Sequence, residues 1–334
     1  MTSYGPETTT DEVLLDHDLT GRHFMITGAS SGLGEESSRA LAQAGATVTM
    51  LARNQSKLDK AIERIKSTNP SAVLKTGIAD LSDQQSIRDY AQGFLATGET
   101  IDVLINNAGV MVCPFGKTAD GIEMQFGTNH IGHFLLTNLL MPAILAGANP
   151  RIVNLSSAGH THSDVNLDDP NFEKSEYNAW ESYGRSKSAN IHFTQEIVRR
   201  YGDRIQSFAV HPGVIMTELG RHLTPELMSE MTERVKSRST SSSEAKETGA
   251  LPFKSVEAGA ATQVWASVTE DLAENNGAYL GDCQLGVEGG NPSESGYLPY
   301  IFNRDTAEAL WSLSEELVKQ EFPKSTYIII SNAF

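Results

Sequence analysis

Cysteine is scarce in this chain of 334 residues, which contains only Cys113 and Cys283. Two cysteines that lie so far apart match neither the ligand spacing of a zinc site nor a disulfide framework. We therefore expect both to be buried packing residues, and we expect no metal site. A chain without disulfides is typical of a reducing compartment, so the sequence predicts a cytoplasmic protein.

Basic residues are also few, since 26 lysines and arginines stand against 42 acidic residues and the formal net charge is −16. Nucleic acids and anionic membranes are bound through a basic surface, which this composition does not supply. We therefore expect neither as a partner. A single local cation can still bind the phosphate of a small molecule, so a phosphorylated cofactor is compatible with this charge.

Long apolar runs are missing as well. No stretch reaches the roughly 18 apolar residues that a transmembrane helix requires. Residues 1–18 are polar and acidic, and they lack the basic and apolar regions of a signal peptide. These absences predict a soluble chain.

What the chain does contain is an alternation of short apolar, β-branched runs with longer amphipathic segments. The expected strands cover residues 23–27, 47–51, 72–78, 101–105, 151–155, 205–210 and 278–280. The expected helices cover residues 33–44, 55–67, 83–96, 121–145, 177–200 and 256–268. Strands and helices that alternate at this spacing form right-handed βαβ units. They predict a doubly wound α/β fold around a parallel sheet of about seven strands.

The same pattern predicts a single domain with two extensions. We expect a nucleotide-binding domain over residues 21–285, an N-terminal extension over 1–20 and a C-terminal extension over 286–334. Residues 214–252 interrupt the alternation and include the serine-rich run 237–243. We interpret 214–252 as a cap over the substrate end of the site, and a surface excursion is the alternative.

A glycine-rich turn follows the first expected strand and precedes the first long expected helix. Its sequence is TGASSGLG over residues 27–34. Glycine lets the backbone approach a pyrophosphate closely, and the next helix begins with free N–H groups and a positive dipole end. In this strand–turn–helix context the turn predicts a dinucleotide site rather than an ordinary connection. The candidate phosphate-binding residues are Gly28, Ser30, Ser31, Gly32, Leu33 and Gly34.

The glycine spacing, Gly-x-x-x-Gly-x-Gly, resembles the cofactor loop of the short-chain dehydrogenase/reductase family. Further motifs of that family follow in order, namely Asp80-Leu81, Asn106-Asn107-Ala108-Gly109, Asn129, Ser156-Ser157, Tyr183-Gly184-Arg185-Ser186-Lys187 and His211-Pro212-Gly213. The resemblance covers residues 21–285. It implies an enzyme that moves a hydride between a nicotinamide cofactor and a carbonyl or alcohol group.

The residue after the second expected strand discriminates between the two nicotinamide cofactors. NAD-binding enzymes place a carboxylate there, which bonds the ribose hydroxyls and would repel a 2′-phosphate. This chain has Ala52 and Arg53 instead, and a guanidinium suits the geometry and charge of a phosphate. We therefore expect NADP(H). The alternative is a solvated arginine in an NAD-preferring enzyme of the hydroxysteroid dehydrogenase type.

The resemblance also implies the remaining cofactor contacts. It implies that Asp80 and Leu81 lie around the adenine. On the floor of the site after the fourth strand, it implies Asn107, Ala108 and Gly109. At the nicotinamide end, it implies Pro212, Gly213 and Thr217, of which Thr217 would bond the carboxamide.

Tyr183 and Lys187 lie four residues apart in a strongly helical stretch, so both side chains leave the same face of one helix. The pKa of an ordinary phenol is about 10, too high for a base at neutral pH. A nearby ammonium stabilises the phenolate, and we expect Lys187, with the added positive charge of the bound nicotinamide, to lower the pKa of Tyr183 in this way. The pair therefore predicts a proton-transfer centre, and the resemblance implies that both residues also contact the cofactor.

Three further motifs complete the candidate site. Ser157 ends the fifth strand, at the edge where doubly wound sheets bind ligands, so its hydroxyl can donate to the substrate oxygen; Ser156 is the alternative. The resemblance implies that Asn129 holds a water that links the lysine to solvent, and a buried asparagine that satisfies a backbone carbonyl is the alternative. His130 and His133 are predicted to be packing or solvent-facing residues rather than metal ligands.

The segment between Ser157 and Tyr183 is longer than in compact members of the family. With AGH at 158–160 and DDPNF at 168–172, it resembles the branch that holds retinol-dehydrogenase-like, WW-domain-oxidoreductase-like and protochlorophyllide-reductase-like proteins. We expect a mostly apolar substrate, such as a steroid, a retinoid-like or an aromatic molecule. The alternative functions are a non-catalytic NADP(H)-binding redox sensor and an epimerase or dehydratase. The sequence does not decide between a monomer and a homodimer.

Overall fold

Seven parallel strands and one antiparallel strand form a single sheet in the computed structural model, which describes residues 4–238 and 253–323. The spatial order is β3-β2-β1-β4-β5-β6-β9-β10. The strands are β1 (His23–Thr27), β2 (Thr47–Ala52), β3 (Val73–Ile78), β4 (Val103–Asn106), β5 (Arg151–Leu155), β6 (Gln206–His211), β9 (Tyr279–Gly281) and β10 (Gln284–Leu285). The predicted doubly wound fold is confirmed. Because the strand order reverses between β1 and β4, a crevice forms at the carboxyl ends of these strands.

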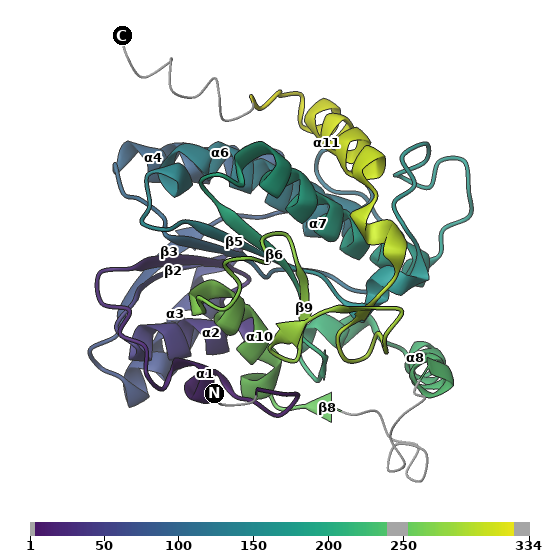
Figure 1. Cartoon of the computed structure of the whole chain (residues 1–334). Helices are drawn as coiled ribbons and strands as arrows, with labels where there is room; N and C mark the ends of the chain where they lie inside the picture. Colours follow the sequence, from purple (N-terminus) through teal and green to yellow (C-terminus); the bar gives the residue numbers. More distant parts are fainter. Residues whose placement is uncertain (1–3, 239–252, 324–334) are drawn as a thin grey trace.

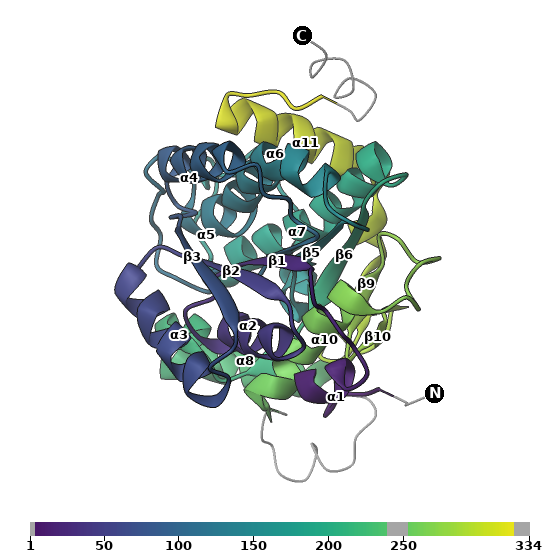
Figure 2. The same cartoon turned by 90° about the vertical axis from the view of Figure 1, so that its left-hand side faces the viewer.

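Helices cover both faces of the sheet (Figure 1). One face carries α1 (Thr10–Leu14), α2 (Gly32–Gln43), α3 (Gln55–Thr68) and α10 (Val256–Val268). The other face carries α4 (Gln84–Ala96), α6 (Gly132–Leu145), α7 (Ala179–Tyr201) and α11 (Arg304–Val318). Figure 2 shows the two helical layers from the side, with the sheet between them.

The central strands are apolar because both of their faces are covered. Every residue of β1 and β5 is buried. One apolar cluster, which includes Phe24 and Val264, packs between the sheet and the layer of α2 and α10. A second cluster, which includes Phe134 and Phe193, packs on the opposite face under α6 and α7. These two clusters hold the carboxyl ends of the strands in fixed positions.

The helix predicted over residues 121–145 is divided in the structure. It begins with α5 (Met124–Phe126), whose first N–H groups are accepted by the Glu123 carboxylate. A π-helical turn, η1 (Gly127–Ile131), follows before the helix continues as α6. The predicted start was too early because the buried carboxylate of Glu123, rather than Gly121, caps the first turn.

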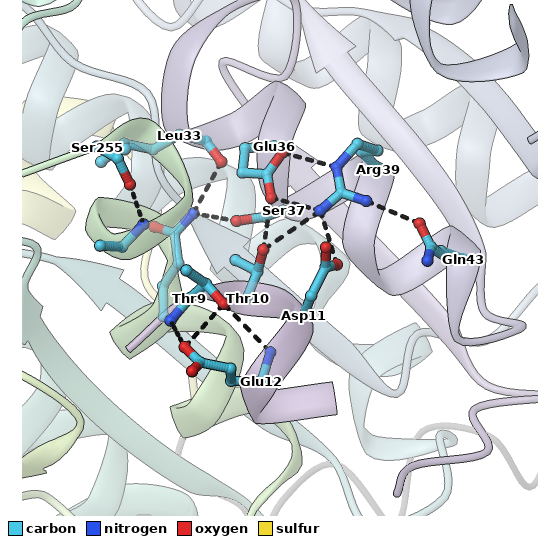
Figure 3. Close-up of polar contacts among 12 residues, drawn as sticks. Thr9, Thr10, Asp11, Glu12, Leu33, Glu36, Ser37, Arg39, Gln43 and Ser255 are labelled. Carbon is cyan, nitrogen blue, oxygen red and sulfur yellow. Dashed lines mark hydrogen bonds and ion pairs between the residues drawn. The ribbon is translucent and has the colours of Figure 1, made fainter. Parts of the chain in front are cut away.

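The predicted N-terminal extension contains the short helix α1, which is attached to α2 by polar contacts (Figure 3). Thr9 and Glu12 form a capping box at its start. Arg39 of α2 donates to Asp11 of α1 at 2.8 Å and to Glu36 of its own helix at 2.7 Å. The extension therefore packs on the helix that begins at the glycine-rich loop.

The predicted C-terminal extension contains α11, which lies against α7 at the outside of its layer (Figure 1). The ring of Trp311 lies 4.9 Å from Phe134 and 5.8 Å from Phe193, measured between ring centres. The extension thus contributes a large aromatic side chain to the core beneath α7, which the sequence analysis did not foresee.

The predicted cap leaves the sheet after β6 and returns before α10. Its described part holds β7 (Val214–Ile215), the short helix η3 (Glu218–His222) and α8 (Pro225–Arg238). β7 pairs with β8 (Phe253–Lys254), so the beginning and the end of the excursion lie side by side. Residues 239–252 of the predicted cap, with most of the serine-rich run, lie outside the described residues.

Candidate active site

A cavity of about 510 Å³ lies at the carboxyl ends of the parallel strands. Most of the predicted site residues line it, namely Gly28, Ser30, Ser31, Gly32, Leu33, Arg53, Asp80, Leu81, Asn107, Ala108, Gly109, Ser157, Tyr183, Lys187, Pro212, Gly213 and Thr217. The predicted residues Gly34 and Asn129 lie behind the wall instead. The fold therefore gathers into one place motifs that are spread over almost two hundred residues of sequence.

The glycine-rich turn has the backbone conformation that its sequence predicts. Gly28 and Gly32 have φ angles of 66° and 57°, which L side chains rarely adopt. Ser31 is the N-cap residue of α2 but makes no side-chain capping bond, whereas Asn54 caps α3 with its side chain. The first N–H groups of α2 are therefore left for another acceptor. A helix start of this kind at a cavity wall fits the pyrophosphate of a dinucleotide.

The predicted floor of the site is bonded to the end of β1. The hydroxyl of Thr27 accepts the backbone N–H groups of Asn107 and Ala108, each at 2.9 Å. The side chain of Asn107 donates to the Thr27 carbonyl oxygen at 2.8 Å. These bonds fix the loop after β4 against the root of the glycine-rich turn, so the two cofactor-facing loops form one rigid surface.

Arg53 lies at the rim of the cavity with an exposed side chain. Within the described parts of the chain, no carboxylate forms an ion pair with Arg53. The neighbouring cation Lys57 also lines the cavity, and it pairs with Glu218 of the cap at 3.0 Å. The predicted 2′-phosphate position is therefore bordered by two cations, one of which contacts the cap.

Close contacts at two glycines hold the loops at the predicted adenine and nicotinamide ends of the cofactor site. A Cβ on Gly132 would lie 2.4 Å from the carbonyl oxygen of Leu81, so the start of α6 touches the adenine-side loop directly. At the other end, a Cβ on Gly32 would lie 3.3 Å from Cγ2 of Thr217. The first turn of the cap therefore lies against the glycine-rich turn.

Tyr183 and Lys187 leave the same face of α7 and are both buried at the cavity wall. Nζ of Lys187 lies 5.7 Å from the centre of the Tyr183 ring, and it donates to the carbonyl oxygen of Leu155 at 3.0 Å. Burial raises the pKa of Tyr183 to about 12, although a hydrogen bond with Ser157 opposes the rise. Burial also lowers the pKa of Lys187 to about 8.

The predicted lowering of the Tyr183 pKa counts on a bound nicotinamide as well as on Lys187, and in the protein chain by itself burial raises this pKa instead. Desolvation disfavours the charged form of both groups, and it is the largest cause of both pKa shifts because both side chains are buried. The ammonium is also bonded to a backbone carbonyl rather than to the phenol. A phenolate at neutral pH would require a further positive charge in the cavity.

The two serines after β5 have different partners. The hydroxyl of Ser156 donates to the carbonyl oxygen of Lys187 at 2.9 Å. The hydroxyl of Ser157 accepts the N–H of Gly159 at 3.0 Å and bonds with Tyr183. The geometry therefore favours Ser157 over Ser156 as the residue that reaches a substrate oxygen beside the phenol.

Asn129 lies in the π-helical turn and is fully buried. Its Oδ1 accepts the N–H of Val110 at 2.8 Å, while its Nδ2 donates to the Val110 carbonyl and to the Ser186 hydroxyl, each at 2.9 Å. These bonds match the alternative interpretation, an asparagine that satisfies backbone groups. A Cβ on Gly109 would lie 3.2 Å from Oδ1 of Asn129 and 3.7 Å from Nζ of Lys187. Both atoms thus lie beside Gly109, and the water expected between the lysine and solvent stays a prediction.

The other end of the cavity is apolar, and half of the residues named here belong to the predicted cap. This end is lined by Met111, Trp180, Leu223, Met228, Met231 and Phe253. The ring of His162 stacks on Trp180 with centres 5.1 Å apart. Trp180 precedes Tyr183 by three residues, so helical spacing could have revealed it. Pro292 and Ser293 also line the cavity, and no local signal marks them.

Residues 4–238 and 253–323 contain neither a cluster of metal-ligand side chains nor a helix able to cross a bilayer. In these ranges no group of three or more histidine, cysteine or carboxylate side chains is placed to hold a metal ion. Cys113 and Cys283 are buried and unpaired. No helix in the same ranges combines the length and the apolar composition that crossing a bilayer needs.

Known proteins have sequences related to this one. The sequence model of the short chain dehydrogenase family matches residues 22–227. The chain belongs to the short-chain dehydrogenase/reductase family. Mouse retinol dehydrogenase 12 is 36% identical over 306 residues, which cover 90% of this chain and 87% of the mouse protein. The short-chain dehydrogenase/reductase prx1 of Penicillium roqueforti is 37% identical over 323 residues, with 92% and 89% covered.

Solved structures share the fold of this short-chain dehydrogenase/reductase. A crystal structure of an uncharacterised protein from Mycobacterium paratuberculosis is 32% identical, has a TM-score of 0.70, and covers 93% of this chain and 98% of its own. The Pseudomonas aeruginosa protein RhlG, solved with NADP, is 22% identical with a TM-score of 0.60. It covers 79% of this chain and 95% of its own. At this identity RhlG supports the fold alone.

The comparisons confirm two predictions made from the sequence. The chain is a short-chain dehydrogenase/reductase of the retinol-dehydrogenase-like branch. It is an enzyme that acts on alcohol and carbonyl groups with a nicotinamide cofactor, rather than a non-catalytic sensor.

Proposed function

We propose that the protein is an NADP(H)-dependent oxidoreductase that interconverts a ketone or aldehyde with the corresponding alcohol on a mostly apolar small molecule. One observation carries the proposal. In a single cavity, Tyr183 lies between the polar loops described above and an apolar end around Trp180. The relatives named retinol dehydrogenase support an apolar substrate.

The proposed reaction assigns a separate task to each polar side chain. A nicotinamide cofactor supplies a hydride to the carbonyl carbon, or accepts it in the reverse direction. Tyr183 donates its phenolic proton to the carbonyl oxygen, so hydride and proton together convert C=O into CH–OH. Ser157 donates a hydrogen bond to the same oxygen while negative charge develops on it. The Lys187 ammonium stabilises the phenolate that remains.

The pKa of Tyr183 bears on the direction of the reaction. Because burial raises this pKa to about 12, the phenol keeps its proton at neutral pH, and reduction requires that form. Oxidation requires the phenolate, which the positive charge of an oxidised nicotinamide would favour. The protonated phenol of the chain by itself is therefore the form that carbonyl reduction uses.

Arg53→Ala tests the choice of cofactor. If the guanidinium pairs with the 2′-phosphate, its loss removes a charge-assisted bond of about 1.5–3 kcal/mol, which raises KM for NADPH by about 10- to 150-fold. KM for NADH should stay close to that of the parent enzyme. Initial rates with each cofactor at saturating carbonyl measure both constants.

Lys60→Ala is the matched control for Arg53→Ala, because Lys60 is an exposed cation on α3 that does not line the cavity. It should leave both constants unchanged. An equal loss of affinity for NADPH and NADH in Arg53→Ala would show that the arginine does not recognise the 2′-phosphate.

Ser157→Ala tests the proposed donor to the substrate oxygen. Removing one such donor is expected to lower kcat by about 10²–10³-fold, with little change in the Kd for NADPH. Ser156→Ala is the control, because that hydroxyl bonds the Lys187 carbonyl instead; its kcat should fall less than about 10-fold. A reversed order of the two effects would transfer the role to Ser156.

The apolar end of the cavity is tested with pairs of carbonyl substrates. Each pair consists of an apolar aldehyde or ketone and a hydroxylated analogue of similar size, and NADPH absorbance reports turnover. We expect higher kcat/KM for the apolar member, because burying an unpaired hydroxyl beside Trp180 and Met231 costs about 1–3 kcal/mol. A consistent preference for the hydroxylated members would contradict the proposed substrate class.

A further inference from the structure

His133 joins two parts of the site that lie far apart in sequence. It stands in the first turn of α6, with 1% of its surface exposed. One ring nitrogen, Nε2, lies 2.8 Å from the hydroxyl oxygen of Thr27. The other, Nδ1, lies 2.9 Å from the carbonyl oxygen of Asn129. The local sequence predicts a packing or solvent-facing residue at His133, and its two polar partners show a more specific use.

The direction of each bond follows from the partners. A carbonyl oxygen only accepts, so Nδ1 of His133 carries a proton and donates it to Asn129. The hydroxyl of Thr27 already accepts two backbone N–H groups. Its own proton is therefore available to Nε2, which accepts it. Burial lowers the pKa of His133 to about 4, and the charge of Lys187 adds to this, so the neutral form that makes both bonds persists at neutral pH.

Each partner of His133 leads to a different part of the active site. Thr27 holds the floor loop against the root of the glycine-rich turn. Asn129 bonds the hydroxyl of Ser186, which in turn donates to the carbonyl oxygen of Tyr183 at 2.8 Å. A continuous chain of hydrogen bonds therefore runs from the cofactor loops to the helix that carries the proposed proton donor.

We propose that His133 is a positioning residue that fixes the cofactor loops relative to the catalytic helix, through Thr27 on one ring nitrogen and Asn129 on the other. His133 does not line the cavity and touches no reacting atom. It acts through Thr27 and Asn129. Losing the bond to Thr27 should therefore weaken cofactor binding, and losing the bond to Asn129 should lower kcat. The part of this inference that concerns kcat rests on the proposed function.

Two variants separate the bonds, because an asparagine amide can replace Nδ1 and a glutamine amide can reach the position of Nε2. His133→Asn keeps a donor for Asn129 and loses the partner of Thr27. We expect its Kd for NADPH to rise about 10-fold, with kcat nearly unchanged. His133→Gln keeps an acceptor for Thr27 and loses the donor to Asn129. We expect its kcat to fall about 10-fold, with the Kd for NADPH nearly unchanged.

Substitutions at Thr27 provide an independent test of the bond between His133 and Thr27. Thr27→Ser keeps the hydroxyl and should bind NADPH like the parent enzyme. Thr27→Val keeps the shape and removes the hydroxyl, so it should weaken NADPH at least as much as His133→Asn, since the floor loop also loses its acceptor. Combining Thr27→Val with His133→Asn should add little to the loss caused by Thr27→Val alone, because both remove the same bond.

His130 provides the matched control, since it is equally buried one turn earlier and bonds Ser314 of α11 instead. His130→Asn and His130→Gln should lower the Tm without separating kcat from the Kd for NADPH. The measurements are NADPH fluorescence titration, carbonyl turnover and thermal unfolding for all variants.

The inference is overturned if both His133 variants change kcat and Kd in parallel, or if they lower only the Tm, as expected for His130. If the parent enzyme reduces no carbonyl, the proposed function fails. The NADPH titrations then still decide about His133, because only His133→Asn and Thr27→Val should weaken binding. Equal weakening in His133→Gln would overturn the inference in that case too.

Discussion

Replacing Tyr183 with phenylalanine should lower kcat by about 10³-fold or more while the protein still folds and binds NADPH. The tyrosine serves as proton donor and as hydrogen-bond donor to the developing oxyanion, roles that contribute about 10²–10⁴-fold and 10²–10³-fold. Phenylalanine keeps the ring, which packs with Val112 and Trp180. Steady-state rates of carbonyl reduction, with NADPH titration and thermal unfolding, measure the three properties. The loss should exceed that of Ser157→Ala.

Tyr177→Phe is the control for this prediction. The side chain of Tyr177 is partly buried and its hydroxyl donates to the Cys113 carbonyl at 2.9 Å, but this tyrosine does not line the cavity. Its removal should lower the free energy of unfolding by about 1 kcal/mol and leave kcat nearly unchanged. Near-normal turnover in Tyr183→Phe would contradict the proton-transfer scheme, even with the fold and cofactor correct.

Replacing Lys187 with methionine should abolish most turnover and also make the protein more stable. Burial lowers the pKa of Lys187 from 10.5 to about 8, so keeping the charge at pH 7 costs about 3 kcal/mol of folding free energy. Methionine fills a similar volume without charge. The carbonyl of Leu155 stays satisfied, because Asn190 also donates to it at 2.9 Å. Denaturant unfolding and steady-state kinetics measure the two effects.

The stability gain of Lys187→Met should depend on pH. Between pH 8 and 10.5 the unfolded chain holds a proton on this lysine that the folded chain has lost, so the parent protein gains stability as the pH rises. The advantage of the variant is therefore full below pH 8 and disappears toward pH 10.5. A variant that is less stable than the parent at pH 7 would show that burial does not destabilise this ammonium.

Local patterns in the sequence predicted much of the fold, and most of the predicted site residues line the cavity. Strands such as β1 and β5 are recognisable because burial on both faces favours short, mostly apolar runs. Arg53 and the residues of the glycine-rich turn follow their strands directly, so strand position alone brought them to the same edge. For such residues the path from sequence to site needs only the topology of the sheet.

Features that depend on contacts between distant segments were missed. The helix α11 does carry an amphipathic signal, since Ala307, Leu310, Trp311 and Val318 share one buried face, but its place against α7 depends on tertiary packing. His133 reaches Thr27 over more than a hundred residues of sequence, and its local pattern is that of an ordinary buried helix. The direction of the Tyr183 pKa shift likewise depends on burial depth, which the spacing of tyrosine and lysine does not reveal.

Transfer of deuterium from NADPH to substrate tests the central claim most directly. The enzyme is incubated with apolar aldehydes or ketones and with NADPH that carries deuterium at C4 of the nicotinamide, each face labelled in turn. Mass spectrometry then follows the alcohol. The proposed function predicts an alcohol that contains one deuterium from only one of the two labelled cofactors, and a product nearly absent with Tyr183→Phe. Alcohol formed without the label from either cofactor, or formed equally well by Tyr183→Phe, would contradict it.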